Sequence, residues 1–120
     1  MSHQHVHQVQ SLDDLQQLLN STTYVMVDFY ADWCPPCRMI APVYDELAAK
    51  HRVEGVLAFA SANVDKLQDV AQAYSVTAMP TFIFFKQGKK VAVNGDEMVR
   101  GADAQRLTAA AEKLAGLAQQ

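Results

Sequence analysis

Apolar residues along this chain recur at two spacings, one typical of amphipathic helices and the other of buried strands. Four stretches repeat apolar residues every three or four positions, which places them on one face of a helix. Ser11, Asp65 and Asp103 precede three of these stretches and are predicted N-caps, because their side chains can accept hydrogen bonds from the first helical turn. The apolar stripes are Leu12, Leu15, Leu18 and Leu19; Ile40, Val43 and Leu47; Leu67, Val70, Ala71 and Tyr74; and Leu107, Ala110, Ala111, Leu114 and Leu117.

Between the helical stretches lie runs of β-branched and aromatic residues that predict strands. Residues 23–30, 56–64 and 81–85 are nearly continuous in apolar side chains, as strands buried on both faces are. A short edge strand is expected at residues 6–9. The second helix is expected at residues 34–51, and Pro42 is expected to kink it because proline removes one backbone hydrogen bond.

Two turn signals follow the last buried strand. Gln87-Gly88 predicts a hairpin turn into another strand near Lys89. Asn94-Gly95 is a second turn signal, and residues 91–100 are therefore longer than a simple edge strand requires. The order β-α-β-α-β-α-β-β-α predicts an α/β domain, with parallel strands joined by right-handed crossovers and a closing antiparallel hairpin.

Composition narrows the classes of protein to which the chain can belong. A length of 120 residues predicts a single domain over 1–120, with residues 1–5 expected as a flexible leader. The net charge of −3 and the lack of a basic cluster argue against nucleic acid as a partner. The longest apolar run, residues 24–31, is too short to cross a membrane. The chain does not open with a secretory signal, so a reducing cytoplasmic location is expected.

The chemistry of the chain centres on its two cysteines, Cys34 and Cys37, which lie between an apolar run and a helical pattern. A Cys-x-x-Cys pair at a strand-to-helix junction is typical of a redox site. Unpaired N–H groups at a helix N-terminus stabilise a thiolate, which is the reactive form of cysteine. The pair therefore predicts a dithiol–disulfide oxidoreductase. The alternative is half of a zinc site, but no second Cys or Cys/His pair stands at a suitable spacing.

Asp28 is the one carboxylate within a strongly apolar strand. Burial should raise its pKa towards the range useful for a base at neutral pH, and it is the best candidate to accept the proton of Cys37. The alternative is a buried acid held by a hydrogen bond, with no kinetic role.

Three histidines alternate near the start of the chain, at His3, His5 and His7. On a strand they would share one face and could bind a metal ion. The alternative is a solvated leader that runs into the edge strand, and no carboxylate or cysteine joins the row in sequence.

With these motifs in view, the chain resembles the thioredoxin family over residues 6–118, in a form that looks eukaryotic and fungal. The resemblance implies a thioredoxin fold, with a central mixed five-stranded sheet flanked by four helices. It also implies reduction of disulfides in other proteins, recharging by an NADPH-dependent thioredoxin reductase, a monomeric state, and no metal or cofactor of its own. The motifs are Val27-Asp28-Phe29-Tyr30-Ala31, Trp33-Cys34-Pro35-Pro36-Cys37, Met39-Ile40-Ala41-Pro42, Asn63-Val64-Asp65, Ala78-Met79-Pro80-Thr81-Phe82 and Gly101-Ala102-Asp103.

The same resemblance implies roles for single residues. Cys34 would be the nucleophile with its sulfur at the surface, and Cys37 would lie slightly deeper and resolve the mixed disulfide. Pro80 would follow a cis peptide bond beside the cysteines and leave the Met79 backbone free to pair with an extended substrate. The expected substrate-binding residues are Trp33, Pro35, Pro36, Met79, Pro80, Gly101 and Ala102. For Trp33 and Met79 the alternative is ordinary core packing.

Three departures from the family pattern keep other functions open. Pro35 stands where the family usually has Gly, Ser61 stands where it often has Lys, and residues 91–100 are longer than usual. The Trp-Cys-Pro-Pro-Cys-Arg motif is similar to tryparedoxins and nucleoredoxins, so a tryparedoxin-like or glutathione-coupled oxidoreductase is one alternative. The others are an oxidant or isomerase of the protein-disulfide type and a non-catalytic module that binds peptides.

Overall fold

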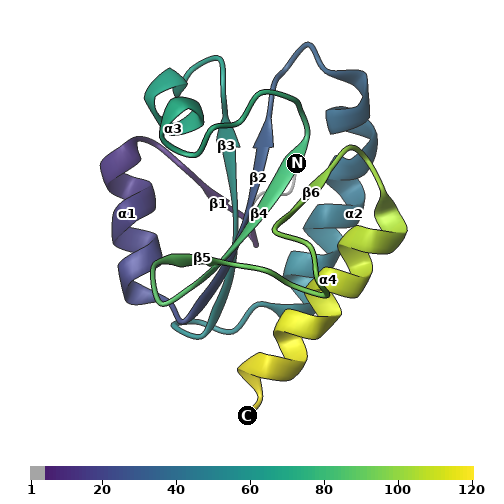
Figure 1. Cartoon of the computed structure of the whole chain (residues 1–120). Helices are drawn as coiled ribbons and strands as arrows, with labels where there is room; N and C mark the ends of the chain where they lie inside the picture. The colour runs from purple at the N-terminus through teal and green to yellow at the C-terminus, as the bar shows by residue number, and fades with distance from the viewer. Residues whose placement is uncertain (1–4) are drawn as a thin grey trace.

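The computed structural model of the chain describes residues 5–120, and a single mixed sheet lies at its centre (Figure 1). Helices α1 and α3 lie on one side of the sheet and α2 and α4 on the other. The elements in chain order are β1 (His7–Gln8), α1 (Leu12–Ser21), β2 (Tyr24–Tyr30), α2 (Pro35–His51), β3 (Leu57–Asn63), α3 (Gln68–Ala73), β4 (Thr81–Lys86), β5 (Lys89–Val91), β6 (Met98–Arg100) and α4 (Ala104–Ala118).

The sheet has the order β1-β3-β2-β4-β5, and β6 also pairs with β4. Strands β1, β3 and β2 are parallel, whereas β4 runs antiparallel to β2 and to both of its later neighbours. The mixed sheet and the four helices confirm the predicted fold class. Strands β5 and β6 lie end to end along the same edge of β4, opposite residues 84–86 and 81–83. The predicted fifth strand is therefore an edge strand in two pieces.

The interruption between β5 and β6 comes from the second predicted turn. Val93 and Asp96 form an antiparallel bridge around Asn94-Gly95. Both central residues have positive φ, 53° and 84°, which is the conformation that two-residue hairpin turns require. Arg106 of α4 forms an ion pair with Asp96 at 2.9 Å, and this contact joins the turn between β5 and β6 to the last helix.

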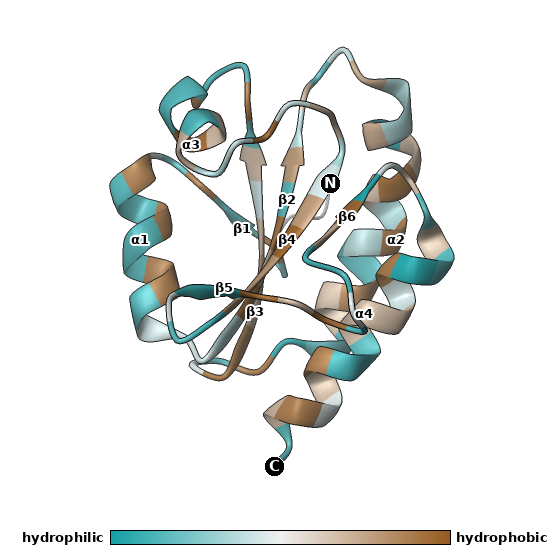
Figure 2. Cartoon of the chain, in the orientation of Figure 1, coloured by the Kyte–Doolittle hydropathy of each residue, from teal (hydrophilic) through white to brown (hydrophobic). Residues whose placement is uncertain are grey.

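Two apolar clusters occupy the two faces of the sheet, and the brown strands of Figure 2 run between them. Along β2 the side chains alternate: Met26 belongs to the cluster under α2 and α4, and Val25 and Val27 belong to the cluster under α1 and α3. Asp28 continues the Met26 face by the same alternation. The buried acid therefore points towards the helix that carries both cysteines.

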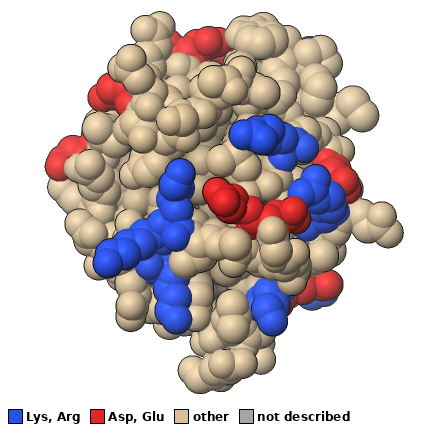
Figure 3. Space-filling model, viewed as in Figure 1, with Lys and Arg blue, Asp and Glu red and all other residues tan. Residues whose placement is uncertain are grey.

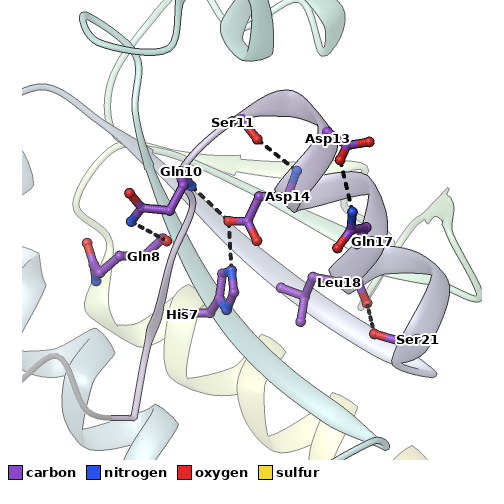
Figure 4. A network of polar contacts seen from close by, with 9 residues as sticks. All are labelled: His7, Gln8, Gln10, Ser11, Asp13, Asp14, Gln17, Leu18 and Ser21. Atoms are coloured by element: carbon purple, nitrogen blue, oxygen red, sulfur yellow. Dashed lines mark hydrogen bonds and ion pairs between the residues drawn. The ribbon is translucent and has the colours of Figure 1, made fainter.

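Two of the three predicted helix caps are confirmed. Ser11 Oγ accepts a hydrogen bond from the Asp14 N–H at 2.9 Å (Figure 4), and Asp103 Oδ1 accepts one from the Arg106 N–H at 3.0 Å. The prediction for Asp65 is wrong. Helix α3 begins at Gln68 after Leu67, which makes no side-chain cap.

The reason lies one turn earlier, at Asn63. Its Oδ1 accepts hydrogen bonds from the N–H groups of Asp65 and Lys66, at 3.0 and 3.3 Å. Residues 64–66 form a turn, and Asp65 therefore lies in that turn and not at the helix start. Helix α2 continues through Pro42 without a break, and the predicted kink stays a prediction.

The histidine row is only partly described, because His3 lies outside residues 5–120. His7 Nε2 contacts Asp14 Oδ2 at 2.9 Å, as Figure 4 shows, and this contact joins β1 to α1. Among the described residues, no three His, Cys, Asp or Glu side chains gather in a group that could hold a metal ion. None of the helices within residues 5–120 combines the length and hydropathy of a membrane span.

Candidate functional site

The two cysteines lie where β2 gives way to α2. The Cys34 N–H donates to the Ala31 carbonyl at 3.3 Å, which turns the chain after the strand. Cys34 is the N-cap of α2, and its Sγ accepts a hydrogen bond from the Cys37 N–H at 3.2 Å. Pro35 and Pro36 occupy the first helical positions, where a missing N–H costs no helical hydrogen bond. The Cys37 N–H is thus the donor in the first turn that reaches the Cys34 sulfur.

Cys34 and Cys37 are joined in a disulfide, with their Cα atoms 5.3 Å apart. The expected difference in depth is wrong for this oxidised state, since the residues are 3% and 4% exposed. The Cys34 sulfur is bonded to the Cys37 sulfur and lies 3.6 Å from the Met79 carbonyl oxygen.

Met79 and Pro80 approach the cysteines from the loop before β4. The Met79–Pro80 peptide bond is cis, as the resemblance implied. The Pro80 carbonyl accepts a hydrogen bond from the Gly101 N–H at 2.8 Å, which fixes the start of β4 against the end of β6. No backbone hydrogen bond within residues 5–120 engages the Met79 N–H.

The remaining expected contact residues differ in exposure. Trp33 is 63% exposed, so core packing does not explain it. Pro35, Pro36 and Ala102 are exposed, whereas Met79 and Gly101 are half-buried. Met39 on α2 is 74% exposed and was missed as a surface residue of this region. Its position three residues after Pro36 would have placed it on the same helix face.

Asp28 is buried beside this site. The residue is 5% exposed, and its Oδ1 is buried with no hydrogen-bond partner. Burial raises its pKa to about 8, and the nearby negative charge of Asp45 contributes in the same direction. The alternative of an acid held by a hydrogen bond is therefore not supported at this oxygen.

A cavity of about 230 Å³ joins Asp28 to the second cysteine. Asp28 and Cys37 both line it, whereas Cys34 does not. The other lining residues come from β1, β3, the loop after β2 and helix α2: they are Val6, Gln8, Tyr30, Ala31, Asp32, Arg38, Ala41, Tyr44, Asp45 and Ser61.

Three of these lining residues were missed by sequence reasoning. Gln8 belongs to a two-residue strand with no apolar pattern to orient it. Asp45 and Tyr44 follow Cys37 by two turns of α2, and this spacing alone could have placed them on the face of Cys37. The Tyr44 hydroxyl lies 2.9 Å from the Met26 carbonyl and 2.7 Å from the Ala60 carbonyl, which holds α2 over β2 and β3.

Comparison with known proteins points to one family. A family model described as thioredoxin matches residues 5–113. A thioredoxin-like protein of Fusarium culmorum is 66% identical over 114 residues, which cover 95% of this chain and 94% of that protein. A thioredoxin of Neurospora crassa is 54% identical over 115 residues, covering 96% and 91%. The crystal structure of Malassezia sympodialis thioredoxin superposes with a TM-score of 0.79 at 34% identity, covering 92% of this chain and 90% of that one.

Proposed function

The chain belongs to the thioredoxin family and is a thiol–disulfide oxidoreductase, and we propose that it reduces protein disulfides with Cys34 as the nucleophile. The observation that carries the proposal is the position of Cys34 at the N-cap of α2, with Cys37 within bonding reach one turn on. In the reduced protein, the amide at Cys37 and the helix N-terminus favour the Cys34 thiolate over the thiol.

The reaction proceeds by two exchanges. In the first, the Cys34 thiolate attacks one sulfur of a substrate disulfide; a Cys34–substrate S–S bond forms, and the other substrate sulfur leaves as a thiolate. In the second, Cys37 attacks the Cys34 sulfur; the Cys34–Cys37 bond forms and the bond to substrate breaks. The substrate disulfide gains two electrons, and the cysteine pair loses two and closes as its own disulfide.

Asp28 is proposed as the base of the second exchange. Cys37 must lose its thiol proton before it attacks, and Asp28 lines the same cavity as Cys37. A carboxyl group with a pKa of about 8 is poised to accept and release a proton near neutral pH. The proton passes from the Cys37 sulfur to the Asp28 carboxylate, which becomes a neutral carboxylic acid.

An extended segment of the substrate is proposed to pair with Met79. The Met79 N–H has no backbone partner within residues 5–120, and the Met79 carbonyl lies beside the Cys34 sulfur. Strand-like pairing with a free backbone group is a common mode of peptide recognition. The contact surface around this segment consists of Trp33, Pro35, Pro36, Met79, Pro80, Gly101 and Ala102.

Membership of the family implies disulfide-containing protein substrates and a thioredoxin reductase as partners. We further propose that the Cys-Pro-Pro-Cys motif is the active site of this chain. We also propose that the protein acts as a monomer and resides in the cytoplasm. The two cysteines form the one disulfide between them and leave no free cysteine, so the fold does not depend on a separate structural disulfide. A tryparedoxin-like or glutathione-coupled activity is the alternative, favoured by the Trp-Cys-Pro-Pro-Cys-Arg motif.

Coupled NADPH oxidation distinguishes these two assignments. Purified thioredoxin reductase, insulin and this protein should consume NADPH at a rate proportional to the protein concentration. Glutathione with glutathione reductase should support much slower turnover at equal protein concentration. Faster turnover with glutathione would assign the chain to the alternative, and insulin reduction in neither system would contradict the proposed reductase.

A further inference from the structure

Three polar residues lie in one row across the parallel half of the sheet. Gln8 of β1 is in register with Ser61 of β3, and Ser61 is in register with Asp28 of β2. Residues in register on neighbouring strands project from the same face of a sheet. The apolar neighbours Val6, Met26 and Phe59 belong to the cluster under α2 and α4, so the polar row points towards α2.

The row lines the cavity described above, which also receives Asp45 and Tyr44 from α2. Neighbouring strands lie about 4.8 Å apart, so the backbones of Gln8 and Asp28 are separated by roughly 10 Å. The short side chain of Ser61 stands between them. The cavity volume of about 230 Å³ far exceeds the space that one water molecule needs.

Both ends of the row carry a buried atom without a protein partner. Gln8 Nε2 is a hydrogen-bond donor and Asp28 Oδ1 is an acceptor, and neither is paired within residues 5–120. Buried polar atoms almost always bind a protein group or an ordered water. A polar cavity between a donor and an acceptor meets the conditions under which water is held.

We propose that Gln8 and Ser61 hold a water molecule against the Asp28 carboxylate and are positioning residues for its proton transfer. The water accepts a hydrogen bond from Gln8 Nε2 and donates one to Asp28 Oδ1. Ser61 leaves the space above β3 open and offers its hydroxyl as a third partner. Gln8 lies on a strand far from the cysteines in sequence, and the proposed site gives it a role in the proton transfer that accompanies their exchange.

The bound water gives the proton of Asp28 a route to solvent. After the second exchange the neutral carboxylic acid transfers its proton to the water, which passes a proton to solvent and leaves the carboxylate restored. Asp32 and Arg38 are exposed residues of the cavity lining, so the mouth lies on their side. The Arg38 guanidinium donates to the Asp32 carbonyl at 2.6 Å. The titratable and charged side chains that line the cavity around Asp28 are Tyr30, Asp32, Cys37, Arg38, Tyr44 and Asp45.

A carbonyl-carbon NMR titration of Asp28 tests the water site in Gln8→Met. Methionine keeps the length of the side chain and removes the donor. Loss of the bound water removes a hydrogen bond to the charged form, so the pKa of Asp28 should rise by about one unit. Gln16→Met on α1 is the matched control, because Gln16 is exposed and absent from the cavity lining. An unchanged pKa of Asp28 in Gln8→Met, or an equal rise in Gln16→Met, overturns the proposal.

Water–protein cross-relaxation in the unmodified chain tests the same site without a variant. The side-chain amide protons of Gln8 should show contacts with a long-lived water, and Ser61→Val should remove them by filling the space. Absence of such contacts in the unmodified chain overturns the proposal.

The route to solvent rests on the proposed role of Asp28 as a base, whereas these two readouts do not. If the pKa of Asp28 rises in Gln8→Met and the rate of the second exchange stays the same, the water site stands and the base role fails.

Discussion

At the scale of single residues, two acidic side chains share the cavity beside Cys37. Asp28 and Asp45 both line it, and the charge of Asp45 adds to the effect of burial on the pKa of Asp28. Like charges at short range disfavour ionisation of both groups. Asp45 on α2 therefore adjusts the pKa of the proposed base.

Asp45→Asn should lower the pKa of Asp28 below its value of about 8, because one source of negative charge is removed while burial is kept. The measurement is a carbonyl-carbon NMR titration. Glu46→Gln is the matched control, since the next residue carries the same charge but is exposed and absent from the cavity lining. A fall of equal size in both variants would mean that Asp45 acts only through the overall charge of the protein.

The raised pKa of Asp28 could be predicted from sequence because a lone carboxylate in an apolar strand is expected to be buried, and burial disfavours its charged form. The contribution of Asp45 could not, since it depends on which face of α2 packs against β2. The cis bond before Pro80 came from the family resemblance alone, because an X–Pro bond is trans in most folded proteins. The burial of both cysteines could not be predicted, because it depends on how the loop before β4 approaches them, and Met79 is distant from them in sequence.

At the scale of elements, the helix starts show what local sequence can decide. Ser11 and Asp103 cap their helices as predicted, because each needs only an N–H three residues ahead. Asp65 does not cap α3, because Asn63 already accepts the N–H groups of the turn between them. Asn63 and Asp65 are both side chains that could accept N–H groups in this short segment. Asn63 does so because it stands at the end of β3, directly before the turn.

Ser11→Ala should reduce the free energy of unfolding by about 1 kcal/mol, because the Asp14 N–H loses its acceptor in the first turn of α1. Urea denaturation followed by circular dichroism measures this change. Ser21→Ala at the other end of α1 is the control; its hydroxyl contacts the Leu18 carbonyl at 3.3 Å, as Figure 4 shows, and its loss should cost less. Equal losses in the two variants would argue against a capping role for Ser11.

The edge of the sheet was predicted only in outline. The turn at Asn94-Gly95 was expected, but its effect, a single edge strand divided into β5 and β6, depends on pairing with β4. On the face shown in Figure 3, basic side chains gather over the hairpin between β4 and β5, which carries Lys86, Lys89 and Lys90. Lysines on an exposed edge discourage pairing with strands of other molecules. We interpret this cluster as protection of the edge.

At the scale of the whole molecule, the buried acid links stability to pH. The pKa of Asp28 is raised from an ordinary 3.8 to about 8 in the folded state. The folded protein therefore holds this proton more tightly than the unfolded chain does. The stabilising contribution is full below pH 3.8, and it is lost as the pH rises towards about 8.

Asp28→Asn should therefore stabilise the protein increasingly as the pH rises, because asparagine cannot ionise in the buried site. Urea midpoints of the variant and the parent chain should be similar near pH 4 and should differ most at pH 8 and above. Glu112→Gln on the exposed face of α4 removes one negative charge without burial and should show no comparable trend. A constant difference across this pH range would mean that Asp28 keeps an ordinary pKa.

The overall arrangement was the most predictable level of all. Continuous apolar runs predicted that β2, β3 and β4 are strands buried on both faces, and the two apolar clusters confirm this prediction. Alternation of strands and helices then left few possible topologies, because crossovers between parallel strands are right-handed. The cavity could not be predicted, since it arises where polar residues of three strands meet one helix.

The most direct test of the proposed reductase is the mass of the complex that each single-cysteine variant forms with a protein disulfide. Cys37→Ser should accumulate a covalent adduct with a substrate protein that carries a disulfide, because Cys34 attacks that disulfide and nothing resolves the mixed disulfide. Cys34→Ser should form no adduct in the time that Cys37→Ser needs to form one. It should also fail to reduce insulin. Rapid adduct formation by Cys34→Ser, or full insulin reduction by either variant, would contradict the assignment of Cys34 as nucleophile and Cys37 as resolving residue.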